Sequence, residues 1–203
     1  FSSGDSYYAI YLLMGFYGLR GGEALGISWG DIDTDKNIIR IRRQVEFVDG
    51  RYVYAELKTN AGRRDLPIVG IIKDILDDLS HTEHGPLPDL LFKTPNGLPV
   101  DPANMRRKFK RLSLDAGLPI ISPHHLRHTA ATNLKDLGIA PKDAQMILGH
   151  AHISTTMQIY QHSNMSGRSE ALERYELEIA EKSMISRQIK PSNEKAIARN
   201  NDS

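Results

Sequence analysis

The apolar residues of this chain change their spacing twice, and this change limits the fold more than any other feature. Between Asn37 and Val48, isoleucine and valine alternate with polar residues, as in a β-strand with one buried face. Asp49-Gly50 is a strong signal for a tight hairpin turn, and Arg51–Leu57 alternates again. Asp65–Val69 is a third extended segment, which Pro67 restricts to the edge of a sheet. The pattern predicts a small three-stranded antiparallel sheet.

Helical spacing of apolar residues dominates on both sides of these strands. Ser122-Pro123 combines a capping side chain with a proline suited to the first helical position, and Gly149 is suited to end a helix. We therefore expect an α+β protein that is mainly α-helical. The expected helices are Tyr7–Tyr17, Gly22–Ser28, a segment around Ile71–Leu79, Asp101–Ala116, a helix that opens at Ser122-Pro123, Pro141–Leu148, a helix capped by Ser154 that carries Tyr160, and Glu170–Lys182.

The composition excludes several classes of protein. The chain has 203 residues, 40% of them hydrophobic, which suits one domain with one sizeable core. It has no cysteine, so disulfides and thiolate metal sites are excluded. The densest apolar run, Tyr7–Tyr17, is shorter than the ~20 residues that span a bilayer, and its flanks lack the pattern of a signal peptide. We therefore expect a cytoplasmic location without membrane association. Because the chain begins at Phe1 rather than Met, we also expect it to be part of a longer protein.

One short motif has the composition of a phosphate site. In Ser122-Pro123-His124-His125-Leu126-Arg127, His124 and Arg127 are three residues apart, so on a helix they project to the same side. Both lie in the first turn, where free backbone N–H groups and the helix dipole favour an anion. An imidazole beside a permanent cation suits a phosphate. Taken alone, however, the pair also fits a surface histidine and an arginine bound to an acid.

Four further candidates have equally ordinary interpretations when each is taken alone. Arg20 lies among Gly18, Gly21 and Gly22, which allow close backbone approach, but an arginine between two helices is usually structural. Lys58 lies at a turn, where a lysine is usually solvated. His150 lies just past a helix end, where a histidine usually caps or packs. Tyr160 lies among polar neighbours, where a tyrosine is usually half-buried.

Together, the order of these residues resembles the tyrosine recombinases, also called the phage integrase family. The family pattern is G-L-R-x-x-E, a lysine at a β-turn, H-x-L-R-H-T, L-G-H and, about ten residues further on, a tyrosine. Here the pattern is met by Gly18-Leu19-Arg20 with Glu23, Lys58-Thr59, His124–Thr129, Leu148-Gly149-His150 and Tyr160. Trp29 with Asp31-Ile32-Asp33, and residues 63–68 (Arg63-Arg64-Asp65-Leu66-Pro67-Ile68), are also similar to stretches of the family. The resemblance covers roughly Tyr7 to His162.

The resemblance implies the catalytic-domain fold of this family and an enzyme that cleaves and rejoins DNA strands in the integration or excision of a mobile element. Tyr160 would attack a phosphodiester to form a 3′-phosphotyrosyl intermediate, so neither ATP nor another cofactor is expected. His124 would exchange the proton of the nucleophile, and Lys58 would protonate the leaving 5′-oxygen.

The remaining members of the motif would bind the scissile phosphate. Arg20 and Arg127 would hold its non-bridging oxygens, with His150 donating a further hydrogen bond. With these cations in place, no metal is expected. Glu23 would orient a catalytic side chain. His125 stands where many members have aspartate, which implies an altered local contact rather than lost activity. The implied catalytic set is Arg20, Lys58, His124, Arg127, His150 and Tyr160.

Binding to double-stranded DNA needs a local basic surface, because the formal net charge is only +1. One cluster is expected to contact the DNA backbone, with a solvated helix face as the alternative. It consists of Arg106, Arg107, Lys108, Lys110 and Arg111.

Residues 1–168 are expected to form the catalytic domain. Residues 169–185 are expected to form a C-terminal helix exchanged between protomers, followed by a polar, disordered tail over residues 186–203. The resemblance further implies a homo-tetramer on paired DNA sites in the full-length protein, with weak DNA binding by this domain alone.

Three other interpretations compete with this one. Leu126–Leu137 and Pro141–Leu148, joined by a short turn, are similar to a helix-turn-helix of a DNA-binding regulator, but that class leaves Arg20, Lys58 and Tyr160 unexplained. A zinc hydrolase is suggested by the histidines, although the glutamate of H-E-x-x-H is absent. Type IB topoisomerases use a similar residue set, but the L-G-H wording is closer to integrases.

Overall fold

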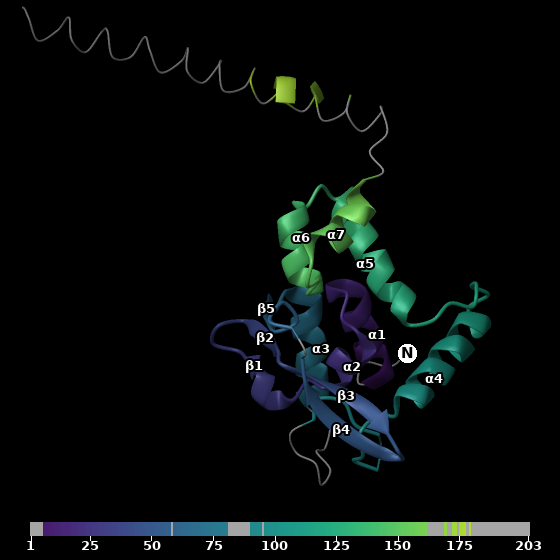
Figure 1. Ribbon diagram of the computed structural model, residues 1–203. Coiled ribbons are helices and arrows are strands. Elements are labelled where there is room, and N and C mark those ends of the chain that lie inside the picture. Colours follow the sequence, from purple (N-terminus) through teal and green to yellow (C-terminus); the bar gives the residue numbers. More distant parts are fainter. Residues whose placement is uncertain are drawn as a thin grey trace, which may run out of the picture. The chain divides into compact units, whose positions relative to one another are not determined.

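The computed structural model describes residues 6–57, 59–80, 90–94 and 96–161, with a few positions between 169 and 179. The chain divides into two units, Phe1–Tyr160 and Gln161–Ser203. The first unit combines helices with two small antiparallel sheets (Figure 1). The prediction of a mainly helical α+β fold is confirmed.

The sheet differs from its prediction. β2 (Ile38–Ile41) pairs antiparallel with β1 (Ile32–Asp33) and β5 (Arg64–Pro67), whereas β3 (Arg43–Val48) and β4 (Arg51–Glu56) form a separate hairpin. The single strand expected over residues 37–48 is therefore wrong.

The break between β2 and β3 falls at Arg42. Its guanidinium turns towards β5, where it donates to the Arg64 carbonyl at 3.0 Å and pairs with Asp65. Alternation continues through this position in the sequence, so the pattern cannot indicate the break. β5 is an edge strand, as Pro67 predicts.

Most helices lie close to their predicted positions. Two predicted capping positions differ: α5 begins at His124, one residue after Pro123, and α7 begins at Ile153, so Ser154 lies inside the helix and does not cap it. The helices are α1 (Ser6–Tyr17), α2 (Gly21–Leu25), a 3₁₀ turn (Trp29–Asp31), α3 (Gly70–Ser80), α4 (Pro102–Asp115), α5 (His124–Asp136), α6 (Pro141–Leu148) and α7 (Ile153–Tyr160).

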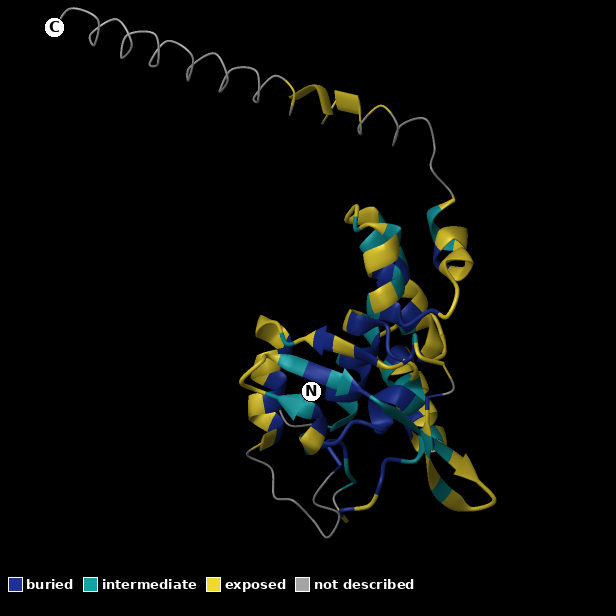
Figure 2. Cartoon of the chain, turned by 60° about the vertical axis from the view of Figure 1, so that its left-hand side comes forward, coloured by how far each residue is buried: buried dark blue, intermediate teal, exposed yellow. Residues whose placement is uncertain are grey.

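The main core lies around α1, whose residues are buried or half-buried apart from Phe16. Figure 2 shows buried segments inside the first unit and exposed ones on its outer surface. Side chains from α1, α2, β2, β5 and α3 join one apolar cluster that includes Ile10, Leu13, Ile39, Leu66 and Ile72. A smaller cluster joins α5 to the end of α6 through Ala130, Ala131 and Leu148, with Ile159 of α7 packed against it.

The turn after α1 brings these two clusters together. Gly18 has a φ of +65°, which ends α1 in the left-handed region that favours glycine. A Cβ there would lie 2.4 Å from Leu148 Cδ2 and 3.4 Å from Ala130 Cβ, so the backbone of the turn packs closely on α5 and α6. Arg20, two residues later, is thereby placed beside α5.

The second unit is described only in part. The described positions between 169 and 179 are helical, and their apolar side chains, which include Leu172, Tyr175 and Ile179, are exposed. The tail expected over residues 186–203 lies outside the described residues. Across the described parts of both units, every helix is too short or too polar to span a membrane.

Candidate active site

Arg20 lies at the start of α2 and is anchored by Glu23. The Arg20 backbone N–H donates to Glu23 Oε2 at 3.0 Å, and its Nη1 donates to Oε1 at 2.6 Å. The glutamate is fully buried, whereas the Arg20 side chain is 44% exposed. Glu23 therefore orients an arginine that stays accessible from solvent.

Arg127 lies on the first turns of α5 and is buried against the turn that precedes Arg20. Its Nη1 donates to the Gly18 carbonyl at 2.5 Å, and its Nη2 has no hydrogen-bond partner among the described residues. Burial, together with the nearby charge of Arg20, lowers the pKa of Arg127 to about 10, which still leaves it cationic at neutral pH. An unpaired guanidinium N–H beside a second arginine suits an anion.

His150 follows the left-handed Gly149 that ends α6, and its ring is fixed by α7. Its Nδ1 lies 2.9 Å from the hydroxyl of the fully buried Thr156. The side chain of Gln145 donates to the His150 carbonyl at 3.0 Å, which holds the backbone as well. Burial first, and then the charges of Arg127, Arg20 and Arg64, lowers the pKa of His150 to about 4. The imidazole is therefore neutral at physiological pH.

Arg64 joins these parts but is not among the residues predicted for the site. Its Nη2 lies 3.0 Å from Glu23 Oε2, and both side chains are almost completely buried. Burial alone would raise the pKa of Glu23, but the charges and hydrogen bonds of Arg64 and Arg20 lower it below its usual value. The sequence holds one signal for this role: strand alternation puts Arg64 on the same buried face as Leu66, where a charged residue is unusual.

His124 occupies a neighbouring position on the same helix as Arg127. It is exposed and lines a cavity of about 610 Å³, together with Gly21, Gly22 and Arg106. The adjacent His125 accepts a hydrogen bond from the Ser122 backbone N–H at 3.2 Å through Nδ1.

Of the remaining two predicted catalytic residues, only Tyr160 can be placed, and its hydroxyl lies apart from this group. Lys58 lies outside the described residues, although the turn that follows it is described. The hydroxyl of Tyr160 donates to the Ile139 carbonyl at 2.9 Å, beyond the far end of α5. The length of α5, roughly 14 Å from Arg127 at 1.5 Å per residue, separates that carbonyl from the arginines. Burial raises the pKa of Tyr160.

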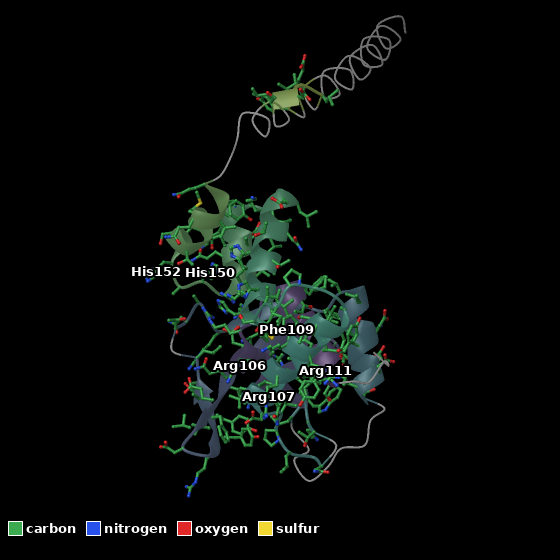
Figure 3. All side chains as sticks on the ribbon, turned by 90° about the vertical axis from the view of Figure 1, so that its right-hand side faces the viewer. Arg106, Arg107, Phe109, Arg111, His150 and His152 are labelled. Atoms are coloured by element: carbon green, nitrogen blue, oxygen red, sulfur yellow. The ribbon has the colours of Figure 1, made fainter. Side chains whose placement is uncertain are left out.

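The predicted basic cluster is exposed on α4 (Figure 3) but does not form one face. Arg106 lines the cavity that also contains His124. On the other side of the helix, Lys108 Nζ lies 5.7 Å from the centre of the Tyr7 ring, and Arg111 pairs with Asp115 at 3.2 Å. Arg106 is therefore the member of the cluster that shares a cavity with a predicted catalytic residue.

A zinc hydrolase, one of the competing interpretations, requires several metal ligands close together. In the part of the chain that the structure describes, no three His, Cys, Asp or Glu side chains lie close enough together to hold a metal ion.

Comparison with known proteins identifies the family. Residues 2–166 match the model of the phage integrase family. Among curated proteins, a tyrosine recombinase XerC-like protein of Caldanaerobacter subterraneus subsp. tengcongensis is 32% identical over 190 residues, 81% of this chain and 48% of the relative. The transposase from transposon Tn916 of Enterococcus faecalis is 27% identical over 184 residues, which cover 83% of this chain and 45% of the transposase. The chain belongs to the phage integrase family, the tyrosine recombinases.

Solved structures agree with this assignment. The Tn1549 transposon integrase in complex with circular intermediate DNA has a TM-score of 0.75 and 27% identity, covering 83% of this chain and 59% of that chain. The XerA recombinase has a TM-score of 0.63 and 27% identity, and the match covers 85% of this chain and 57% of the XerA chain. The fold is that of a tyrosine recombinase catalytic domain. The chain spans about half the length of the curated relatives it matches.

Proposed function

We propose that this domain performs site-specific recombination of DNA in the integration or excision of a mobile element. One observation carries the proposal: Arg20, Arg127 and His150 come from three separate segments and meet around the buried pair of Glu23 and Arg64. Two guanidinium groups and a neutral imidazole suit a phosphodiester, because they bind its oxygens where charge develops in the transition state.

His150 would act as a hydrogen-bond donor to the phosphate rather than as a cation. Its pKa of about 4 keeps the ring neutral, and Thr156 engages Nδ1. If the threonine hydroxyl donates to Nδ1, the single ring proton lies on Nε2. That nitrogen can then donate to a non-bridging oxygen.

In the cleavage step, a bond forms between Tyr160 Oη and phosphorus while the bond from phosphorus to the 5′-oxygen breaks. The tyrosine proton passes to His124, and Lys58 gives a proton to the leaving oxygen. Religation reverses each transfer, so the energy of the phosphodiester is kept in the covalent link. A tyrosine hydroxyl titrates with a pKa of about 10, so its attack at neutral pH depends on a base.

This mechanism requires Tyr160 to move. Its hydroxyl is bound to the Ile139 carbonyl, and the arginines lie at the other end of α5. A single hydrogen bond of this type contributes about 1 kcal/mol, so the tyrosine can be released at small cost. We propose that binding to DNA favours the conformation in which Tyr160 leaves Ile139 and approaches the phosphate.

Double-stranded DNA is the proposed partner. Support comes from the exposed basic residues on α4 and from the Tn1549 integrase, whose structure was solved with DNA. The proposed assembly of the full-length protein is a homo-tetramer on paired DNA sites, with the segment after Tyr160 exchanged between protomers. The exposed Leu172, Tyr175 and Ile179 support such an exchange, because they offer apolar area to a neighbour.

The test is covalent capture. Full-length protein is incubated with fragmented DNA, denatured, and the DNA that stays attached is sequenced. We expect a specific site joined through a 3′-phosphotyrosine. Tyr160→Phe should abolish the adduct while DNA binding persists, and the control Tyr54→Phe, at an exposed position of β4, should retain the adduct. Non-covalent binding alone by the unmodified protein would instead support a plain DNA-binding regulator.

A further inference from the structure

We propose that Arg64 is a positioning residue whose buried guanidinium fixes three segments that carry or adjoin the proposed catalytic side chains. The inference rests on the function proposed above and extends it to a residue outside the proposed catalytic set. The three segments are the start of α2 with Arg20, the turn over residues 59–62 that follows Lys58, and the end of α6 with His150.

Each arm of the guanidinium reaches a different segment. Nη2 lies 3.0 Å from Glu23 Oε2, and Glu23 in turn holds Arg20. Nη1 donates to the Gly62 carbonyl at 2.9 Å, and Nε donates to the Ile147 carbonyl at 2.7 Å. The planar fork of an arginine can make these three contacts at once, whereas the point charge of a lysine cannot.

The backbone before His150 rests directly on this guanidinium. A Cβ on Gly149 would lie 2.5 Å from Arg64 Nη1 and 2.8 Å from Cζ. Gly149 also has a φ of +68°, which favours glycine. The position of His150 is therefore set by contact with Arg64 as well as by its own bond to Thr156.

Fold stability alone does not explain this pair. Removing two charges from water is costly, and replacing a buried ion pair by apolar residues of similar volume is often neutral or stabilising. The Glu23–Arg64 pair instead connects segments that are far apart in the sequence and carry the proposed phosphate ligands. Its contribution would be geometric, since small displacements of reacting groups reduce rates strongly.

The test separates chemistry from DNA binding. In full-length protein, Arg64→Lys keeps the charge but loses the fork; Arg63→Lys is the matched control, because Arg63 is the adjacent arginine and pairs with the exposed Glu56. On the DNA site captured by the unmodified protein, we expect Arg64→Lys to lower the single-turnover rate of adduct formation by about 10²-fold. The Kd for DNA should stay close to that of the unmodified protein, and Arg63→Lys should change neither quantity.

A second measurement needs no DNA. The His150 ring is titrated by NMR in Arg64→Met and Arg63→Met. Losing the Arg64 cation should raise the pKa of His150 from about 4, because Arg127, Arg20 and Glu23 then remain as its charged neighbours. The Arg63 variant should titrate like the unmodified protein.

Three results would overturn the proposal. Arg64→Lys could form the adduct at the rate of the unmodified protein, or it could lose DNA affinity in parallel with the rate. Alternatively, Arg63→Lys could lower the rate of adduct formation as much as Arg64→Lys does. An unmodified protein that forms no adduct would contradict the proposed function instead. The DNA-free titration would still decide whether Arg64 acts on His150.

Discussion

Arg127 and His150 are polar side chains that the fold buries almost completely. For His150, burial makes protonation unfavourable, so the ring is neutral at physiological pH. For Arg127, burial leaves one amino group without a partner among the described residues. An unsatisfied buried donor costs about 1–3 kcal/mol, which an incoming phosphate oxygen would offset. The site thus keeps binding capacity at the expense of stability.

The buried His150 should make stability depend on pH. Its pKa is about 4 in the folded chain, against 6.5 for a histidine surrounded by water, so between these values the unfolded chain holds a proton that the folded chain lacks. Stability should therefore fall as pH drops from about 6.5 to about 5, by up to about 1.4 kcal/mol per pH unit. Glu23 stays ionised in this window, because its pKa is lowered.

Urea unfolding at several pH values measures this slope. His150→Asn should lose most of it, whereas His152→Asn, at an exposed position nearby, should keep it. Equal slopes in the unmodified protein and His150→Asn would contradict the assignment.

The cationic side chains also predict that recombination needs no divalent metal. Arg20, Arg127 and Lys58 would supply the positive charge that a metal ion supplies in other phosphoryl-transfer sites. We expect covalent adducts to form equally fast in excess EDTA and without ATP, as measured by gel assay on the captured DNA site. Loss of the adduct in EDTA and its return with Mg²⁺ would show the prediction to be wrong.

Individual residues were predictable to different degrees. The order of short motifs in the sequence indicates Arg20, Arg127 and His150. Once the family fold is assigned from that order, these three side chains are expected to lie close together. Arg64 was harder, because its partners Gly62, Ile147 and Glu23 are brought together only by tertiary structure. The sequence pattern cannot indicate that the Tyr160 hydroxyl binds the Ile139 carbonyl, because residue order carries no information on the direction of a side chain.

At the level of elements, α4 shows why a run of charges is a weak guide to a surface. Residues four apart share a helical face, so Arg106 and Lys110 lie together, whereas Lys108 lies on another side against Tyr7. The face with Arg106 borders the cavity that contains His124. We therefore expect this face, rather than the whole cluster, to contact DNA.

Neutralising the two faces separately tests this. Arg106→Gln with Lys110→Gln should weaken DNA binding and reduce the slope of log K against log salt by about 2, one for each lost phosphate contact. The matched pair Lys108→Gln with Arg111→Gln removes the same charge and should leave the slope nearly unchanged. Equal effects of both pairs would favour a non-specific charge effect.

The same contrast between local pattern and tertiary structure applies to the strands and helices. Helix positions followed from apolar spacing, and the Asp49-Gly50 turn followed from its residue types, since both have positive φ. The separation of β2 from β3 did not follow, because it depends on contacts between Arg42 and β5. The start of α7 at Ile153 also differs, because Ser154 is not used as a cap.

At the level of the whole molecule, the chain corresponds to about half of its curated relatives. As the family resemblance implies, we expect this domain alone to bind DNA weakly. Assembly would then depend on the segment after Tyr160, whose described apolar side chains are exposed.

Removing the residues after Arg168 from the full-length protein tests that dependence. We expect fewer higher-order complexes on paired DNA sites in sedimentation experiments and altered cleavage, with binding to a single site retained. Polar substitution of Leu172, Tyr175 and Ile179 should give the same result without a deletion. Unchanged recombination by the shortened protein would contradict the proposed exchange.

The hairpin of β3 and β4 has a consequence for how such domains can diverge. Beyond Val45 it contributes no fully buried side chain, and its outer residues Phe47, Val48 and Val53 are exposed. Insertions at an exposed tip are tolerated when the backbone there supports nothing else. The ribbon can therefore gain or lose pairs of residues on either side of Asp49-Gly50 without disturbing the phosphate ligands. Because Phe47 and Val48 also line the cavity with His124, a change in the length of the ribbon would alter the wall of that cavity while the phosphate ligands stay in place.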